Sequence, residues 1–415
     1  MEALELRFTV SEGRTVLTGG GRTACAVQFD GNLRAEFFYD FSPEPLVLSA
    51  DAKAGDHASI RVSPLWIALY VNGALADEEW PCGKGYLSPA CSQIGDLPVE
   101  IAPSGPEADC RQPEALRLNI PTGLIRRPGV NIGDCMPYSD AEGGDGRYHL
   151  FYLYDRHHHK SKWRLGAHQW AHVSTKDLKT WDEHPMAVKL TQDWEGSICT
   201  GSVIRAGGRW YAWYAVRMAD RSPARLTYAV SDDLEHFEKC GAYFHVPEGY
   251  EPTGARDPFL FFWENKYHML VTTRTMDGDS GCLAHLVNDA MGISGWRNAG
   301  PIMRWHDHCA PDSPERRHTP ECADWFRMGG FYYLVFGIGS VSRYLYSKKT
   351  FGPWTYPEGA LIPCGCVPKS AVLPGTGRRI FMGFRGEGGY AGSLCAAEAL
   401  QNEDGTLRFE PVLLE

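Results

Sequence analysis

The feature that most constrains this chain is a local pattern that occurs five times. Each copy has an aromatic or aliphatic β-run, a second run, and a turn that ends in an aromatic residue. The closing aromatic residues follow one another at steps of 56, 59, 58 and 55 residues. A period of this size, built from short strands and turns, predicts an all-β fold with a five-bladed β-propeller. The β-runs are 148–154, 209–214, 266–271, 331–336 and 379–384, and the closing residues are Trp181, Phe237, Trp296, Trp354 and Phe409.

A polar residue lies about one strand and one turn upstream of each β-run. In a propeller the first strand of every blade lines the central channel, so residues at equivalent positions converge on one funnel. Three of the five residues are acids, and like charges at close range cost energy unless a task requires them. The pattern therefore predicts an active site that contains these acids. The five residues are Asp134, Ser202, Asp257, Glu321 and Lys369.

Composition argues against several classes of protein. The net charge of −10 disfavours a nucleic-acid partner, which requires a basic face. No apolar run is long enough to span a membrane, and the first residues lack the charged and then apolar layout of a signal peptide. The 13 Trp, 19 Tyr and 18 Phe suit an all-β protein that stacks aromatic rings against sugars.

Cysteine usage predicts the compartment. The chain has 13 cysteines, an odd number, without the dense and regular spacing of a disulfide-stapled secreted scaffold. We expect most of them to be reduced and packed as small apolar groups. This predicts a cytoplasmic protein. A saccharide substrate would then be a small imported oligosaccharide rather than an extracellular polymer. The sequence leaves a homo-oligomer open.

Two groups of residues resemble metal ligands only superficially. Structural zinc prefers paired Cys-x-x-Cys or His-x(3–5)-His ligands, and the spacings within 306–322 are irregular. The histidines at 157–159 are expected in a loop at the rim of the pocket, where substrate contact is favoured over metal binding. We therefore expect no metal and no organic cofactor. The residues within 306–322 are His306, His308, Cys309, His318 and Cys322.

The sequence predicts two domains. Residues 1–120 contain alternating segments separated by Gly-rich and Asn-Gly turns, which favours a small antiparallel β-sandwich. Residues 104–113, rich in Pro, Gly and acids, resemble a linker. Residues 121–415 are expected to form the catalytic propeller, and the first module is expected to stabilise rather than to bind sugar. Strands are predicted in the first module at 4–10, 24–29, 34–39, 59–62 and 66–71.

The order of the motifs in the propeller resembles that of glycoside hydrolase family 32, the β-fructofuranosidases. The family's Arg-Asp-Pro and Glu-Cys-x-Asp signatures are intact, and a segment similar to its nucleophile element surrounds Asp134. Gly133 stands where the family has Asn, and 135–137 reads Cys-Met-Pro instead of Pro-Asn-Gly. The family's β-sandwich also follows its propeller, whereas here a β-module comes first. The matching segments are 131–137, 170–181, 200–202, 256–258, 321–324 and 367–370.

The resemblance implies a retaining, exo-acting furanosidase that cleaves fructose-containing oligosaccharides. Asp134 would be the nucleophile and Glu321 the acid/base, with their side-chain oxygens about 5–5.5 Å apart. Asp257 would accept hydrogen bonds from vicinal hydroxyls of the sugar ring. Further substrate contacts are expected from Arg256, Gln169, Trp170, His172, Trp194, Ser202 and Lys369.

Two other interpretations stay open from the sequence. One is an inverting arabinofuranosidase or xylosidase of the related five-bladed family, which a carboxylate gap of about 6.5–9.5 Å would favour. The other is a propeller that binds saccharide without catalysis. The complete set of acids disfavours the second interpretation, because a binding funnel needs hydroxyl partners but no proton donor facing a nucleophile.

Overall fold

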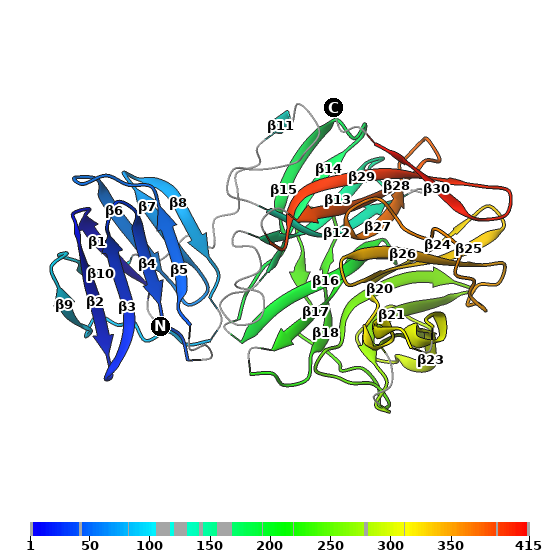
Figure 1. Cartoon of the computed structure of the whole chain (residues 1–415), viewed down its shortest axis with the longest axis horizontal. Helices are drawn as coiled ribbons and strands as arrows, with labels where there is room; N and C mark the ends of the chain where they lie inside the picture. Colours follow the sequence, from blue (N-terminus) through cyan, green and yellow to red (C-terminus); the bar gives the residue numbers. More distant parts are fainter. Residues whose placement is uncertain are drawn as a thin grey trace.

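The protein is built almost entirely of β-strands, as the sequence predicts (Figure 1). Two short 3-10 turns, η2 (Trp305–His308) and η3 (Pro314–Arg317), are the helical elements of the described residues. No helix among them is long and apolar enough to cross a membrane. This computed structural model describes residues 3–40, 44–81, 83–104, 117–119, 131–140, 144–155, 168–192, 194–218, 220–277, 281–310, 312–386 and 389–412.

Two five-stranded antiparallel sheets, ordered β10-β1-β6-β7-β8 and β5-β4-β3-β2-β9, form the N-terminal module. Their alternating apolar side chains share one core, which includes Leu6, Leu33 and Leu69. The five strands predicted in this part of the chain are all present. The strands are β1 (Leu4–Thr9), β2 (Gly13–Gly19), β3 (Arg22–Phe29), β4 (Leu33–Phe37), β5 (Leu46–Ala50), β6 (His57–Val62), β7 (Ile67–Val71), β8 (Ala74–Glu79), β9 (Ser92–Gly95) and β10 (Glu100–Pro103).

The second part of the chain is a five-bladed propeller. Blade 1 is β12 (Asn131–Ser139), β13 (Tyr148–Asp155), β14 (Gln169–Thr175) and β15 (Thr180–Val188), with β11 (Arg117–Asn119) on its edge. Blade 2 is β16 (Glu195–Ala206), β17 (Arg209–Met218), β18 (Arg225–Ser231) and β19 (Glu238–Lys239). Blade 3 is β20 (Arg256–Trp263), β21 (Lys266–Arg274), β22 (Gly281–Asn288) and β23 (Arg297–Arg304). Blade 4 is β24 (Glu321–Met328), β25 (Phe331–Ile338) and β26 (Val341–Ser347), and blade 5 is β27 (Cys366–Val372), β28 (Arg379–Gly386), β29 (Gly392–Gln401) and β30 (Leu407–Pro411).

The first strand of each blade lies at the centre, and these five strands contact one another in a ring. The ring closes between β27 and β12, and β12 also pairs with β29 at Ile132 and Gly392. Each central strand carries a two-residue irregularity at the same place, where pairing with the second strand is interrupted. Such bulges bend a strand and redirect its side chains. The unpaired residues are 133–134, 199–200, 257–258, 322–323 and 367–368.

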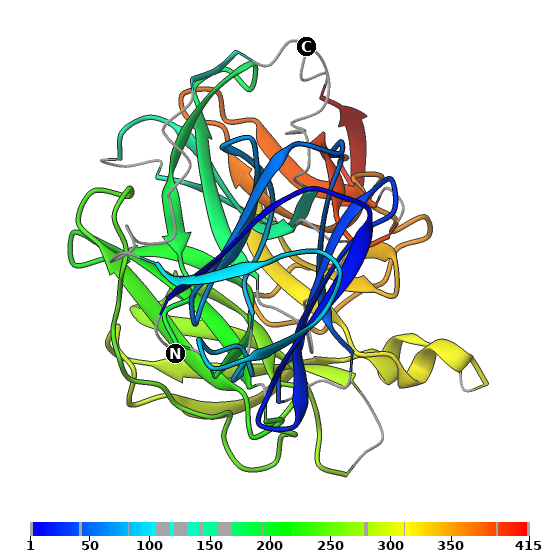
Figure 2. The ribbon, with the colours of Figure 1, turned by 90° about the vertical axis from the view of Figure 1, so that its left-hand side faces the viewer.

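The N-terminal module packs against blade 1, and Figure 2 shows it in front of the propeller. Trp66 and Trp80 join the core cluster that contains Ile132, and the Trp80 ring meets the Tyr154 ring edge-on at 5.3 Å. The predicted domain boundary at 120/121 lies outside the described residues, as do residues 105–113 of the predicted linker. The division into two domains therefore stays a prediction.

Candidate active site

Asp134 lies on the bulge of β12, and side chains from three other blades hold its carboxylate. Thr200 Oγ1 donates a hydrogen bond to Oδ2 over 2.5 Å, and Tyr390 Oη donates to Oδ1 over 2.8 Å. The thiol of Cys322 also points at Oδ2, 3.6 Å away. Only 6% of Asp134 is exposed. These three donor groups fix the orientation of the Asp134 carboxylate at the centre of the ring, because each of them presents a hydrogen to one of its oxygens.

Asp257 lies on the equivalent bulge of β20 and is also buried. The backbone N–H of Cys322 donates to its Oδ2 over 3.3 Å, and Arg256 Nε lies 3.6 Å from the same oxygen. Its backbone adopts the left-handed conformation, with φ of 56°, which is unusual for a residue other than glycine and concentrates at functional sites. Burial raises the pKa of Asp257, Arg256 opposes the rise, and the Glu321 and Asp134 charges add to it. Asp257 therefore shares one electrostatic environment with the other two acids.

Glu321 begins β24 and is the accessible member of the three. Its side chain is 41% exposed and forms an ion pair with Arg256. Asp257 and Asp134 are nearly covered by comparison. A group that exchanges protons with solvent and substrate needs this access. The carboxylates of Asp134 and Asp257 both contact Cys322, the residue next to Glu321, and the charges of Glu321 and Asp134 both act on Asp257. The structure thus brings the three acids together, and their catalytic roles stay a prediction.

Two arginines balance the acidic charge. Arg256 Nη1 donates to the Gly254 carbonyl over 2.7 Å, which directs the rest of the guanidinium towards the acids. Burial alone would lower the pKa of Arg256, but the Glu321 and Asp257 carboxylates raise it above its ordinary value. Arg217 on β17 is in the same field: burial and Arg256 lower its pKa, while Asp257 and Glu321 oppose the change. The site thus holds two guanidinium groups in the electrostatic field of its carboxylates.

Lys369 and Ser202 lie on central strands, as predicted, but beyond the bulges. Lys369 Nζ donates to the Gly201 carbonyl over 2.6 Å, and Ser202 Oγ donates to the Pro258 carbonyl over 3.1 Å. Both line a cavity of about 230 Å³, and most of the other residues that line it also come just after the bulges of the central strands in the sequence. Their polar atoms join neighbouring blades, so contact with a sugar at the carboxylates stays a prediction for both.

Gln169 and Trp170 are on β14, the third strand of blade 1. Gln169 Oε1 accepts from the Leu190 N–H over 2.9 Å, and Trp170 Nε1 donates to the Cys199 carbonyl over 3.0 Å. Trp170 is completely buried between blades 1 and 2. The prediction of Trp170 as a sugar platform is therefore corrected, because only the first strand of a blade lines the channel. Its indole instead fills the space between two blades.

Trp194 and His172 also have partners of their own. The guanidinium of Arg225 lies 4.2 Å from the centre of the Trp194 ring, which is cation–π geometry. The His172 ring is buried on β14, stacked against Phe151 at 4.1 Å and against His184 at 4.2 Å. His172 is thus corrected from a substrate contact to a residue of the blade interior.

The rings of His149, His172 and His184 form the group that comes nearest to a metal site among the described residues. His149 Nδ1 lies 2.9 Å from His172 Nε2, and His149 Nε2 lies 3.0 Å from an Asp145 oxygen. A metal ion must lie in the plane of each imidazole that binds it, along the nitrogen lone pair. His184 Nε2 also has a partner of its own, Ser174 Oγ, 2.8 Å away. Hydrogen bonds among the protein's own groups therefore account for the arrangement of the three rings.

Among the described residues, the group predicted at 306–322 does not bring three ligand atoms together. His306 Nε2 lies 2.8 Å from its neighbour Asp307, and the Cys309 thiol donates to the Trp305 carbonyl over 3.4 Å. The histidines at 157–159 lie outside the described residues.

Sequence reasoning missed Thr200, Tyr390 and Arg217. Thr200 belongs to the matching segment 200–202, but its spacing from the β-run points to Ser202, because a two-residue bulge cannot be seen in a residue count. Arg217 lies one residue before the end of β17, and no motif marks it. Tyr390 lies in a glycine-rich segment just before β29, and its contact with Asp134 spans 256 residues of sequence.

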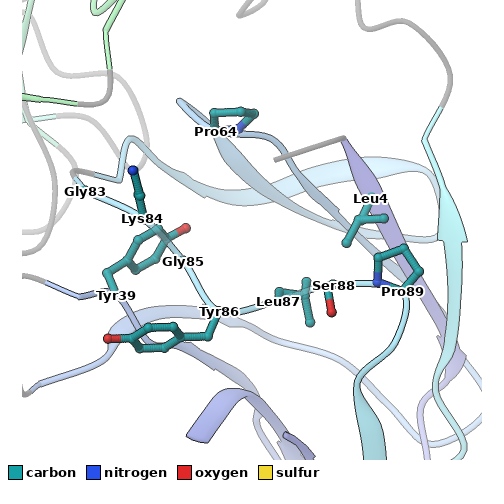
Figure 3. Close-up of a pocket in the computed structure, with 10 residues that line it drawn as sticks. All are labelled: Leu4, Tyr39, Pro64, Gly83, Lys84, Gly85, Tyr86, Leu87, Ser88 and Pro89. Carbon is teal, nitrogen blue, oxygen red and sulfur yellow. The ribbon is translucent and has the colours of Figure 1, made fainter. Parts of the chain in front are cut away.

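A separate cavity of about 420 Å³ lies in the N-terminal module (Figure 3). Tyr39, Lys84 and Tyr86 contribute to its wall, and Arg22 engages the face and the hydroxyl of Tyr86. Hydrolysis of a glycosidic bond needs a pair of carboxyl groups, and the residues that line this cavity contain none. The residues drawn in Figure 3 therefore lack the groups that this chemistry needs.

Comparison with known proteins connects this geometry to one family. Residues 143–350, half of the chain, match the model of the glycosyl hydrolases family 32 N-terminal domain. Sucrose-6-phosphate hydrolase of Bacillus subtilis (strain 168) is 30% identical over 194 residues, which are 46% of this chain and 38% of the relative. The raffinose invertase of Escherichia coli is 26% identical over 46% of this chain and 39% of its own length. The chain thus spans about two fifths of the curated relatives it matches.

Solved structures show the same fold. Fructan 1-exohydrolase IIa from Cichorium intybus superposes with a TM-score of 0.55 at 18% identity, covering 72% of this chain and 61% of that one. Sucrose-6-phosphate hydrolase from Lactobacillus gasseri has a TM-score of 0.55 at 17% identity, covering 68% and 63%. At this identity the likeness supports the propeller architecture alone. The matched family region contains Asp257 and Glu321, whereas Asp134 and Tyr390 lie outside it.

Proposed function

This chain belongs to glycoside hydrolase family 32, and on that premise we propose that it is a retaining, exo-acting β-fructofuranosidase acting on small fructose-containing oligosaccharides. The observation that carries the proposal is the convergence of two buried carboxylates and one accessible carboxylate. The relatives named as sucrose-6-phosphate hydrolases and raffinose invertase favour sucrose-like substrates. The match to family 32 favours this reaction over that of an arabinofuranosidase or xylosidase.

Asp134 supplies the nucleophile in this proposal. Its oxygen forms a bond to the anomeric carbon while the bond from that carbon to the leaving oxygen breaks. Three donors already surround the carboxylate, so it is held in one orientation before substrate arrives. This preorganisation supports attack from a fixed position.

Glu321 supplies the acid and then the base. Its proton passes to the departing sugar oxygen in the first step, and it takes a proton from water when water releases fructose from Asp134. The exposure of its side chain supports this role, because both the leaving group and the incoming water must reach it. The ion pair with Arg256 orients the side chain between the two steps.

Asp257 and Arg256 bind the sugar ring in this proposal. A buried carboxylate that accepts from ring hydroxyls strengthens its hydrogen bonds as positive charge develops on the sugar.

A cytoplasmic location is proposed as well, since every described cysteine is a free thiol, as expected in a reducing compartment.

The test is hydrolysis of sucrose, sucrose 6-phosphate and short fructans, with the first-formed anomer read by NMR. We expect the β-anomer of fructose to appear first. Glu321→Gln should reduce turnover by about 10²–10⁴-fold. Glu315→Gln is the matched control, because Glu315 is also ion-paired to an arginine and 42% exposed but is on η3. Unchanged turnover in Glu321→Gln, or the inverted anomer, would exclude the mechanism.

A further inference from the structure

The hydroxyl of Tyr390 makes two contacts with Asp134. Oη donates to Asp134 Oδ1 over 2.8 Å, and the backbone N–H of Asp134 donates back to Oη over 3.3 Å. Tyr390 precedes β29 in blade 5, so the contact joins the last blade to the first. Burial and the Asp134 charge raise the pKa of Tyr390 well above its usual value. The hydroxyl therefore keeps its proton, and it donates a hydrogen bond to the Asp134 carboxylate.

Gly133 makes the space that this hydroxyl occupies. A Cβ atom at position 133 would lie 2.8 Å from Tyr390 Oη and 3.0 Å from Leu153. Real Cβ atoms do not approach other atoms as closely as 2.8 Å, so any larger residue would displace the hydroxyl. The glycine that departs from the family's usual residue at this position is thus sterically coupled to Tyr390.

The aromatic ring of Tyr390 is held on two sides. His168 stacks against it at 5.7 Å, and Phe384 meets it edge-on at 5.1 Å. His168 is fixed in turn, because its Nε2 lies 3.0 Å from an oxygen of Asp155 at the end of β13. A clamped ring places its hydroxyl without further loss of side-chain freedom, which is how a supporting residue preorganises a reacting group.

We propose that Tyr390 is a positioning residue for the Asp134 carboxylate and that Gly133 is its obligatory steric partner, an assignment that rests on the proposed function. The hydrogen bond stabilises the ionised form of Asp134 before attack. It stabilises the same form again when the bond between Asp134 and the anomeric carbon breaks in the second step.

The first test is Tyr390→Phe, which removes the hydroxyl and keeps the ring. Loss of a hydrogen bond to a charged acceptor should raise the pKa of Asp134 by about one unit. The acid limb of the kcat/KM profile falls as Asp134 takes up its proton, so this limb should move to higher pH by a similar amount. Lower activity with an unmoved acid limb would mean a merely structural role and would overturn the proposal.

The second test is a double-mutant cycle with Gly133→Ala. The added methyl group contacts Leu153 in both backgrounds, but it meets the Tyr390 hydroxyl only in the wild type. We therefore compare the fold-reduction of kcat/KM that Gly133→Ala causes in the two backgrounds. It should be at least ten times smaller in the Tyr390→Phe background than in the wild type. Additive effects would overturn the coupling of the two residues.

The third test needs no turnover and separates this proposal from the proposed function. In protein labelled with 13C at the aspartate carboxyl carbon, the Asp134 signal should titrate at higher pH in Tyr390→Phe than in wild type. Tyr333→Phe is the matched control, because the buried Tyr333 donates to the Gly405 carbonyl, away from the acids. If no fructoside is cleaved and the two titrations still differ, the proposed function fails while the contact stands. Identical titrations would overturn the contact itself.

Discussion

The three acids differ mainly in their access to water. Asp134 and Asp257 are covered and bonded to donors, while the Glu321 side chain is exposed to solvent. Access of this kind separates a carboxylate that must stay ionised from one that must exchange protons. The sequence identified all three acids because their motifs are local. It could not rank their exposure, since the covering residues come from other blades.

A prediction at this scale concerns His172. Burial lowers the pKa of His172 well below 6.5, and the adjacent His184 and His149 lower it further. In the unfolded chain His172 therefore takes up a proton more readily than in the folded protein. Its contribution to the free energy of unfolding is fully present above about pH 6.5 and is lost as the pH falls below that value. In His172→Gln, thermal unfolding should depend less on pH between about 6.5 and 5, as measured by calorimetry.

The cluster of His149, His172 and His184 also has charged neighbours, which the experiment must leave unchanged. Asp145 contacts His149, Glu235 lies 3.5 Å from His184, and Arg147 pairs with Asp182 beside them. The acidic neighbours keep their contacts in His172→Gln, so only one titration is removed. His236→Gln serves as control, because that exposed ring has the opposite shift: its pKa is raised by Asp233. An unaltered pH dependence in His172→Gln would contradict the prediction.

At the scale of elements, the bulges of the central strands decide which side chains meet. The period and the β-runs could be predicted, because apolar and aromatic residues repeat within each blade. The bulges could not, because they depend on how a strand pairs with its neighbour. Two unpaired residues shift the strand that follows, so Thr200 rather than Ser202 reaches Asp134. The same shift places Lys369 beyond the acids.

Gly201 shows how tightly a bulge is packed. A Cβ atom there would overlap the backbone oxygen of Trp213, which cannot move without breaking the pairing of β16 and β17. Gly201→Ala should therefore destabilise the propeller by more than about 4 kcal/mol. Gly330→Ala, in open space between β24 and β25, should change stability by no more than about 0.5 kcal/mol. Denaturant unfolding measures both, and equal effects would contradict the packing argument.

At the scale of the whole molecule, the ring and the N-terminal module each have a core, and they meet at blade 1. Closure of the ring is a long-range event, because β12 contacts β27 and pairs with β29. Composition and turns predict two β-modules, since each has its own strand spacing, and this division stays a prediction. How the modules contact one another could not be predicted, because the contact rests on a few side chains such as Trp80 and Tyr154 that carry no motif.

The last prediction concerns this contact. Trp80→Ala leaves a cavity against Tyr154 and should cost about 3–5 kcal/mol. Because the lost contact joins two cores, calorimetry should show the transitions of module and propeller moving apart. Phe37→Ala is the control: Phe37 is buried in the module alone, so its loss should lower the module's transition and leave the propeller's in place. If Trp80→Ala shifted one undivided transition instead, the two parts would unfold as a single unit, and the division into domains would fall.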